Sequence, residues 1–252
     1  MSLRRPTLAE WFNAHQHRTL WRENSLVFGT LDVDVTAVTA DWEARDLQAH
    51  YPSILARAAA LAAVEVPELN RVYLRTLWGD RWVEFDGVHV AMPVRFEHDG
   101  MPILDATVLK NAHERSALEL RDALRAYVSA GLEATTLTRW VATHPNHPWW
   151  RWALRLVHAL SWRWPLFADH GGAISVSAIA PGNVASRRLN YAGPTPVSVL
   201  VALTGIERTD GRTVLTLGIT LNHLVADGRS MGQYLRALAA LLEGERGVEA
   251  LR

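Results

Sequence analysis

The chain has 252 residues, of which 49% are apolar and 21% charged, so it can bury the core of an ordinary folded domain. Its 26 basic residues balance its 26 acidic residues, and this neutral charge argues against a general nucleic-acid binder, which needs a basic surplus. The absence of cysteine excludes disulfides, thiolate metal sites and a cysteine nucleophile.

No run of apolar residues is long enough to span a bilayer, and the basic start of the chain is not followed by the apolar core of a signal peptide. We therefore expect a soluble, cytoplasmic protein that neither enters a membrane nor binds nucleic acid. No repeat, low-complexity tract or linker divides the sequence, so we expect residues 1–252 to form a single domain.

The first half of the chain predicts strands and helices in mixed order. Apolar Leu31, Val33 and Val35 alternate with polar residues, which is typical of a half-buried strand, and Asp86-Gly87 predicts a turn between later strands. The expected elements are a short helix (Leu8 to His17), an extended segment (Ser25 to Val38), an alanine-rich helix (Ile54 to Val64) and strands at Val72 to Trp78, Trp82 to Phe85, Val88 to Phe96 and Ile103 to Leu109.

The second half predicts three more helices and three more strands. Strands that mix with helices, mostly in hairpins rather than in strict alternation, indicate a two-layer α/β domain with a mixed sheet and helices packed on it. The expected helices are Ser116 to Tyr127, Trp149 to Trp162 and Arg229 to Glu243, and the expected strands are Ala173 to Ile179, Val197 to Leu203 and Thr213 to Asn222.

The predicted helix from Trp149 to Trp162 is amphipathic. Trp149, Trp152 and Leu160 share its apolar face, whereas Arg151 lies off that face. A core helix or a subunit-contact helix is favoured over a membrane-surface helix, because the rest of the sequence is neutral and globular in composition.

The most informative stretch is LTLGITLNHLVADGRSMGQYL, residues 215–235. Alternate apolar residues from Leu215 to Leu221 share one face of a strand, and His223 continues that series. We therefore expect its imidazole to enter a partly dry site, where desolvation favours the neutral form that accepts a proton. Asp227-Gly228 follows as a tight turn, with Gly228 supplying backbone angles that other residues avoid. A structural histidine beside a helix start is the alternative.

Other histidine patterns do not predict a metal site. His144 and His147 have a chelating spacing, and so do His15 and His17, but no carboxylate supports either pair.

The sequence HLVADG, followed by an amphipathic helix, resembles the signature of the chloramphenicol acetyltransferase-like superfamily. This superfamily includes chloramphenicol acetyltransferases, the catalytic domain of the dihydrolipoyl acyltransferases of 2-oxo-acid dehydrogenase complexes, and peptide-synthetase condensation domains. Gly171 to Ser177 resembles the dihydrolipoyl acyltransferase segment that ends in a functional serine, and Ser177 falls on that serine. The likeness extends over most of the chain and is poorest from Ala134 to His170.

The resemblance implies a chloramphenicol acetyltransferase-like fold and acyl transfer from a thioester. His223 would be the general base that deprotonates the acceptor, and Ser177 would donate a hydrogen bond to the developing oxyanion. Asp227 would be a structural anchor more than a relay partner. In the family it pairs with an arginine of the N-terminal segment, a part that Arg22 or Arg18 would take here.

The chain departs from both enzyme types around the histidine. Asn222 and Leu224 stand where the dihydrolipoyl acyltransferases usually carry Asp and Arg, and chloramphenicol acetyltransferases usually have a second histidine at the position of Asn222. The lipoyl and subunit-binding domains of the multienzyme complexes have no counterpart, and Lys110, the only lysine, lies within the predicted catalytic core. The acyl donor is therefore expected from outside, as acetyl-CoA, another acyl-CoA or a carrier-protein thioester.

At this length the chain holds one copy of a fold that condensation-type relatives carry twice. The resemblance thus implies a homotrimer in which Ser177 of one subunit faces His223 of its neighbour. The function it implies is transfer of an acetyl or other acyl group to a small-molecule hydroxyl in natural-product tailoring, for example on a tetronate. The alternatives are a dihydrolipoyl acyltransferase core served by a separate lipoyl carrier, a hydrolase built on Ser177, His223 and Asp227, and a non-catalytic trimeric scaffold.

Overall fold

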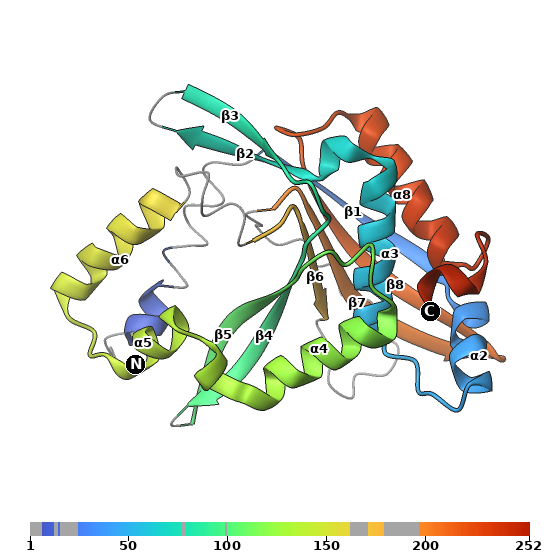
Figure 1. Ribbon diagram of the computed structural model, residues 1–252, viewed down its shortest axis with the longest axis horizontal. Helices are drawn as coiled ribbons and strands as arrows, with labels where there is room; N and C mark the ends of the chain where they lie inside the picture. Colours follow the sequence, from blue (N-terminus) through green and yellow to red (C-terminus); the bar gives the residue numbers. More distant parts are fainter. Residues whose placement is uncertain are drawn as a thin grey trace, which may run out of the picture.

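The computed structural model describes residues 7–12, 15, 25–76, 79–98, 100–161, 171–178 and 197–252. Within these ranges, a six-stranded sheet carries helices on one face, and a separate two-stranded hairpin extends away from it (Figure 1). This is the two-layer α/β architecture with a mixed sheet that the sequence predicts.

The strands of the main sheet run in both directions. Its order is β1 (Leu26–Asp34), β8 (Arg212–Asn222), β7 (Val199–Thr209), β6 (Ile174–Ala178), β4 (Val90–His98) and β5 (Met101–Leu109). The pairs β4–β6 and β6–β7 are parallel, and the other pairs are antiparallel. The hairpin consists of β2 (Arg71–Thr76) and β3 (Gly79–Glu84).

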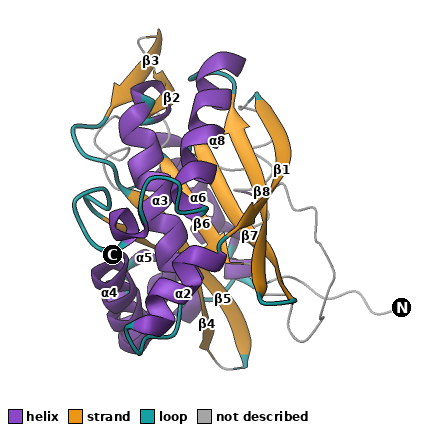
Figure 2. Cartoon of the chain, turned by 90° about the vertical axis from the view of Figure 1, so that its right-hand side faces the viewer, coloured by secondary structure: helices purple, strands orange, loops and turns teal. Residues whose placement is uncertain are grey.

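One face of the sheet is covered by α2 (Thr36–Ala44), α3 (Tyr51–Glu65), α4 (Ala117–Ala130) and α8 (Gly228–Leu242), as Figure 2 shows. Alternate β8 side chains from Leu215 to Leu221 join the same buried cluster as these helices, as the period of the strand predicts. Buried alanines let α3 approach α8 closely, and the Tyr234 hydroxyl of α8 donates a hydrogen bond to the Ala59 carbonyl at 3.3 Å. The main core therefore lies between the helices and this face.

Local signals set the ends of several elements. Helix α3 begins at Tyr51 rather than at Ile54, because the His50 side chain accepts a hydrogen bond from the Ser53 N–H at 3.3 Å and caps the helix. Helix α4 follows Ser116, which forms a capping box with Glu119. Short 3-10 turns lie at Pro67–Leu69, Gly131–Ala134 and Val248–Leu251.

The extended segment expected from Ser25 to Val38 is too long. Strand β1 ends at Asp34, whose carboxylate accepts a hydrogen bond from the Thr36 N–H at 3.0 Å, and α2 starts there. The sequence did not predict this helix, because its threonine and valine residues favour strands.

A second, smaller core lies to one side of the sheet (Figure 1). It joins residues 8–12 to α5 (Leu137–Thr143), a helix the sequence did not predict, and to α6 (Pro148–Ser161). Its buried side chains are Leu8, Phe12, Val141 and Leu154.

The apolar face predicted for α6 does not point into this core. Trp149 and Trp152 are 62% and 56% exposed, and the helix buries Leu154 and His158 instead. The expectation of a core helix is therefore wrong for the single chain, whereas a subunit contact stays a prediction. No helix in the described part of the chain is both long enough and apolar enough to cross a membrane.

Candidate functional site

His223 lies in the turn that joins β8 to α8. The strand ends at Asn222, and the His223 N–H donates to the Ser25 carbonyl at 2.6 Å. The side chain is exposed in the single chain, so the expectation that alternation would carry it into a dry site is wrong here. Alternation fails because the chain leaves the strand geometry one residue before the histidine.

His223 lines a pocket of about 360 Å³ at this end of the sheet. The other residues around it come from the turn before the hairpin, from β2, from the loop after the histidine and from the first turn of α8: Glu68, Arg71, Leu224, Val225, Ala226, Asp227 and Ser230. A larger hollow of about 590 Å³ lies between the end of α3 and α8, and none of the predicted site residues lines it. The histidine therefore faces a space that a ligand can enter.

Asp227 is the N-cap of α8. Its carboxylate accepts hydrogen bonds from the Arg229 N–H at 3.0 Å and the Ser230 N–H at 2.9 Å. The Ser230 and Arg229 N–H groups hold the pKa of Asp227 below its usual range, so the side chain stays ionised at the positive end of the helix dipole. This geometry favours an anchoring part for Asp227. Arg22 and Arg18, its expected partners, lie outside the described residues.

Gly228 is the first residue of α8 and does not have a positive φ. A Cβ at this position would meet no atom within 4 Å in the single chain. The expectation that the turn needs the backbone freedom of glycine is therefore wrong for this position.

Two residues that the sequence analysis missed contact the loop after His223. The Trp82 Nε1–H donates to the Leu224 carbonyl at 3.1 Å. The Arg71 guanidinium donates to the Val225 carbonyl through Nε at 3.1 Å and Nη2 at 2.6 Å. Trp82 and Leu224 are 142 positions apart in the sequence, and Arg71 and Val225 are 154 positions apart. No local pattern in either segment predicts such contacts.

Ser177 lies on β6, on the face of the sheet that points away from the main core. Its neighbour Val176 is buried in that core, and successive side chains of a strand point to opposite faces. The side chain is half-buried, and no hydrogen bond to its hydroxyl is present among the described residues.

The strand register separates Ser177 from His223 within one chain. Ser177 lies beside Ala202 on β7, which lies beside Gly218 on β8. Two strand spacings place the serine about 10 Å from Gly218, and five residues along β8 add about 16 Å to reach the histidine. The two side chains are thus roughly 19 Å apart, too far for one small reacting group to touch both. A triad of Ser177, His223 and Asp227 cannot form within one chain.

No group of three or more histidine, aspartate or glutamate side chains gathers in a metal-binding arrangement within the described ranges. His144 stacks on Trp140 instead, at 4.3 Å between ring centroids, and the exposed His147 accepts a hydrogen bond from the Trp149 N–H. His17 lies outside the described residues.

The sequence matches no family model and no curated protein. Solved structures do match over nearly its whole length. The catalytic core of the 2-oxoacid dehydrogenase multienzyme complex from Thermoplasma acidophilum is 14% identical with a TM-score of 0.68, covering 96% of this chain and 98% of that one. Dihydrolipoamide acetyltransferase from Azotobacter vinelandii is 16% identical with a TM-score of 0.67, covering 99% and 94%.

A chloramphenicol acetyltransferase is also 16% identical, with a TM-score of 0.50 and coverage of 96% of this chain and 98% of that one. Identities this low show the fold and not the reaction.

Proposed function

Because the chain has the chloramphenicol acetyltransferase-like fold that its sequence predicts, we propose that it is an acyltransferase that moves an acyl group from a thioester to an acceptor. The observation that carries this proposal is His223, which lines an open pocket at the end of β8. The Azotobacter vinelandii enzyme was studied for the roles of a serine, a histidine and an asparagine in its mechanism, with the asparagine four positions after the histidine. Asp227 stands four positions after His223 here.

In the proposed reaction, the His223 imidazole takes the proton of an acceptor hydroxyl as the hydroxyl oxygen attacks the thioester carbonyl. A C–O bond forms, and the carbonyl oxygen becomes an oxyanion that accepts a hydrogen bond from Ser177. The C–S bond then breaks, and the thiolate takes the proton from the imidazolium. No acyl-enzyme forms on this route, so neither residue acts as a nucleophile.

We propose that the site is completed by a second copy of the chain. The roughly 19 Å between Ser177 and His223 within one chain leaves each residue without the other, so a working site takes its serine from a neighbour. A symmetric homotrimer meets this need with three equivalent sites. The exposed apolar face of α6 supports association as well, since contiguous apolar patches commonly mark interfaces.

We propose acetyl-CoA as the donor, with other acyl-CoA or carrier-protein thioesters as variants of the same chemistry, and the hydroxyl of a small molecule such as a tetronate as the acceptor. A cytoplasmic tailoring enzyme of natural-product biosynthesis fits these substrates. A second candidate is transfer to the thiol of a dihydrolipoyl group on a separate carrier. It is favoured by TM-scores of 0.67 and 0.68 to the dehydrogenase-complex cores, against 0.50 to chloramphenicol acetyltransferase.

The experiment is an acyl-transfer assay with acetyl-CoA and a panel of hydroxymethyl acceptors, including a tetronate. The chain has no cysteine, so a thiol-reactive chromogenic reagent reports only the CoA that is released. Dihydrolipoamide is added as a thiol acceptor, and its acylation is followed by mass spectrometry. We expect His223→Gln to lower the rate by about 10² to 10⁴, because it removes the proton acceptor but keeps a polar side chain.

His147→Gln is the matched control, because His147 is an exposed histidine outside this pocket and should leave the rate unchanged. A His223→Gln rate within a few-fold of wild type would remove the base from the mechanism. Absence of acyl transfer to every acceptor, together with absence of acyl-CoA binding in calorimetry, would favour the non-catalytic scaffold.

A further inference from the structure

We propose that the β2–β3 hairpin positions His223, with Arg71 and Trp82 as the residues that fix the loop on which the histidine lies. The inference rests on the proposed function for its catalytic meaning. Its physical content, that the hairpin holds the loop, stands on contacts that are measurable without any substrate.

Arg71 and Trp82 hold two successive carbonyl groups of the loop. Arg71 donates twice to the Val225 carbonyl, at 3.1 and 2.6 Å, and Trp82 donates once to the Leu224 carbonyl at 3.1 Å. The Arg71 guanidinium also lies over the Trp82 ring, at 4.8 Å from its centroid, so each side chain orients the other. Hydrogen bonds from a charged donor are among the stronger ones in proteins.

The opposite side of the loop is held by backbone donors. The N–H of His223 bonds to the Ser25 carbonyl at 2.6 Å, and the N–H of Leu224 bonds to Asn222 Oδ1 at 3.0 Å. The N–H of Val225 bonds to the Asn222 carbonyl at 3.2 Å. The hairpin therefore supplies partners for the carbonyl groups of a turn whose N–H groups are already paired. The hydrogen bonds to the carbonyl groups and those from the N–H groups together leave the backbone around His223 little freedom to move.

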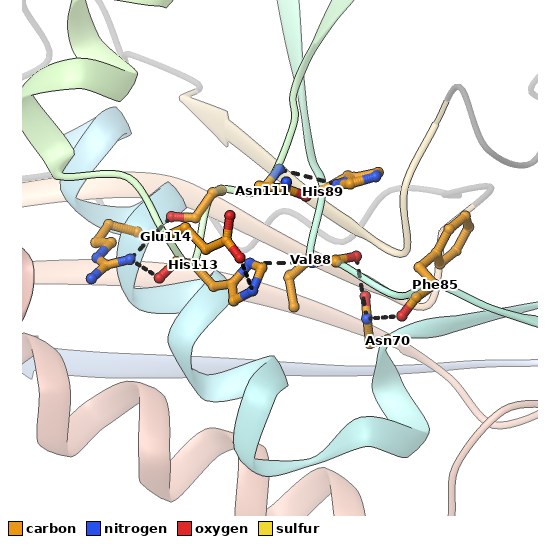
Figure 3. Close-up of polar contacts among 10 residues, drawn as sticks. Asn70, Phe85, Val88, His89, Asn111, His113 and Glu114 are labelled. Carbon is orange, nitrogen blue, oxygen red and sulfur yellow. Dashed lines mark hydrogen bonds and ion pairs between the residues drawn. The ribbon is translucent and has the colours of Figure 1, made fainter.

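The hairpin is itself fixed to the main sheet. The Asn70 side chain donates to the Phe85 carbonyl at 3.0 Å and to the Gly87 carbonyl at 3.4 Å, which closes the base of the hairpin (Figure 3). The Ser198 hydroxyl, at the start of β7, donates to the Arg71 carbonyl. The hairpin is thus attached to the sheet at the residue that holds the loop.

Burial in the core does not explain why a tryptophan stands at position 82. Its side chain is 58% exposed, so it contributes little to the core, and its indole N–H donates to the loop. The Arg71 side chain is mostly buried. Besides its hydrogen bonds to the loop, it forms an ion pair with Glu84 across the hairpin at 3.5 Å. A role in holding the loop explains why an exposed indole and a buried guanidinium meet at this pocket.

The test uses Trp82→Phe, which removes the Nε1 donor but keeps a ring under Arg71, and Arg71→Lys, which keeps the charge but cannot donate twice to one carbonyl. Arg81→Lys is the control for a hairpin arginine that donates to the neighbouring Asp80 carbonyl, and Arg95→Lys is the control for an arginine whose ion pair, to Glu97, lies outside this pocket. The first readout is hydrogen exchange of residues 223–227 by mass spectrometry.

We expect both test variants to speed exchange in this loop about tenfold, the equivalent of one lost hydrogen bond, while the controls leave it unchanged. The second readout is CoA release. We expect kcat to fall about tenfold and the KM for acetyl-CoA to stay within about twofold, because a displaced base affects the chemical step more than donor binding.

Loop exchange at the wild-type rate in both test variants would overturn the proposal. So would a fall in kcat that tracks a general loss of stability, seen as faster exchange across α3 and α8 as well. If the wild-type protein transfers no acyl group, the proposed function fails, and the exchange result alone decides whether the hairpin holds the loop.

Discussion

Ser177 presents its hydroxyl from β6 on the face that points away from the main core. In the proposed reaction this hydroxyl stabilises an oxyanion that exists only in the transition state and the intermediate, so its loss should affect kcat rather than substrate binding. We expect Ser177→Ala to lower kcat by about 10² to 10³, with the KM for acetyl-CoA changed by less than about threefold. Steady-state kinetics of CoA release measures both parameters.

Ser175→Ala is the control for this variant. Ser175 lies on the same face of the same strand and is buried, so its replacement alters β6 without touching Ser177. A Ser177→Ala enzyme as fast as the Ser175→Ala enzyme would exclude the oxyanion role. An acyl group found on Ser177 by mass spectrometry would instead favour the hydrolase.

At the scale of residues, the sequence made His223 a candidate because it follows a regular strand and is part of HLVADG, and the structure places it at the pocket beyond β8. It could not predict that the histidine is exposed, since that depends on the turn in which the N–H groups of Leu224 and Val225 donate to Asn222 and end the strand. Arg71 and Trp82 were missed for a different reason. Their contacts join distant parts of the chain, and neither residue has a local signature.

At the scale of elements, α6 contains a buried histidine whose charge state depends on its packing. His158 is 4% exposed and faces Phe12 and His15. Burial, with a smaller contribution from His15, lowers the pKa of His158 to about 4. The usual pKa of histidine is near 6.5. Between about pH 6.5 and about pH 4, the unfolded chain therefore carries a proton on His158 that the folded chain does not.

We therefore expect the packing of α6 to weaken as the pH falls from about 6.5 to about 4, and to level off below that. Hydrogen exchange of α6, measured across this range, reports the free energy of its local opening. His158→Leu should flatten the dependence, because the titrating group is gone, whereas His147→Leu should leave it as in wild type. An unchanged slope in His158→Leu would show that other groups cause the dependence; His50, whose pKa burial also lowers, lies on another element.

The same helix shows what amphipathic spacing can and cannot predict. The spacing of Trp149, Trp152 and Leu160 correctly predicted a helix and its apolar face. It could not predict what covers that face, because the period of a helix is the same whether its partner is the chain's own core or another subunit. The small core at α6 uses Leu154 and His158, which lie on the other side.

At the scale of the whole molecule, composition and alternation predicted a mixed sheet with helices packed on it, and the resemblance around His223 and Ser177 predicted which fold this is. The strand order could not be read from either source. Strand β1 pairs with β8 although Leu31 and its partner Leu217 are far apart in sequence, and strand pairing of this kind is decided by tertiary packing. The short helices α2 and α5 likewise depend on the cores they cover.

Assembly makes the last prediction, because it follows from a distance that no single residue determines. If each site takes Ser177 from one subunit and His223 from its neighbour, a trimer that mixes Ser177→Ala chains with His223→Gln chains regains sites in which both residues are intact. Light scattering should first give a mass of about 84 kDa, three times the 28.1 kDa chain.

Each variant alone should retain about 1% of the wild-type rate or less. Co-expression in equal amounts should restore about one quarter of the wild-type rate, since each site draws its two residues independently from the mixture. Mixing two separately folded trimers without exchange of subunits is the control, and it should restore nothing. A co-expressed mixture as inactive as its parents would contradict the shared site. A mass of 28.1 kDa with full wild-type activity would contradict it equally, because one chain would then have to bring together two side chains that its strand register holds roughly 19 Å apart.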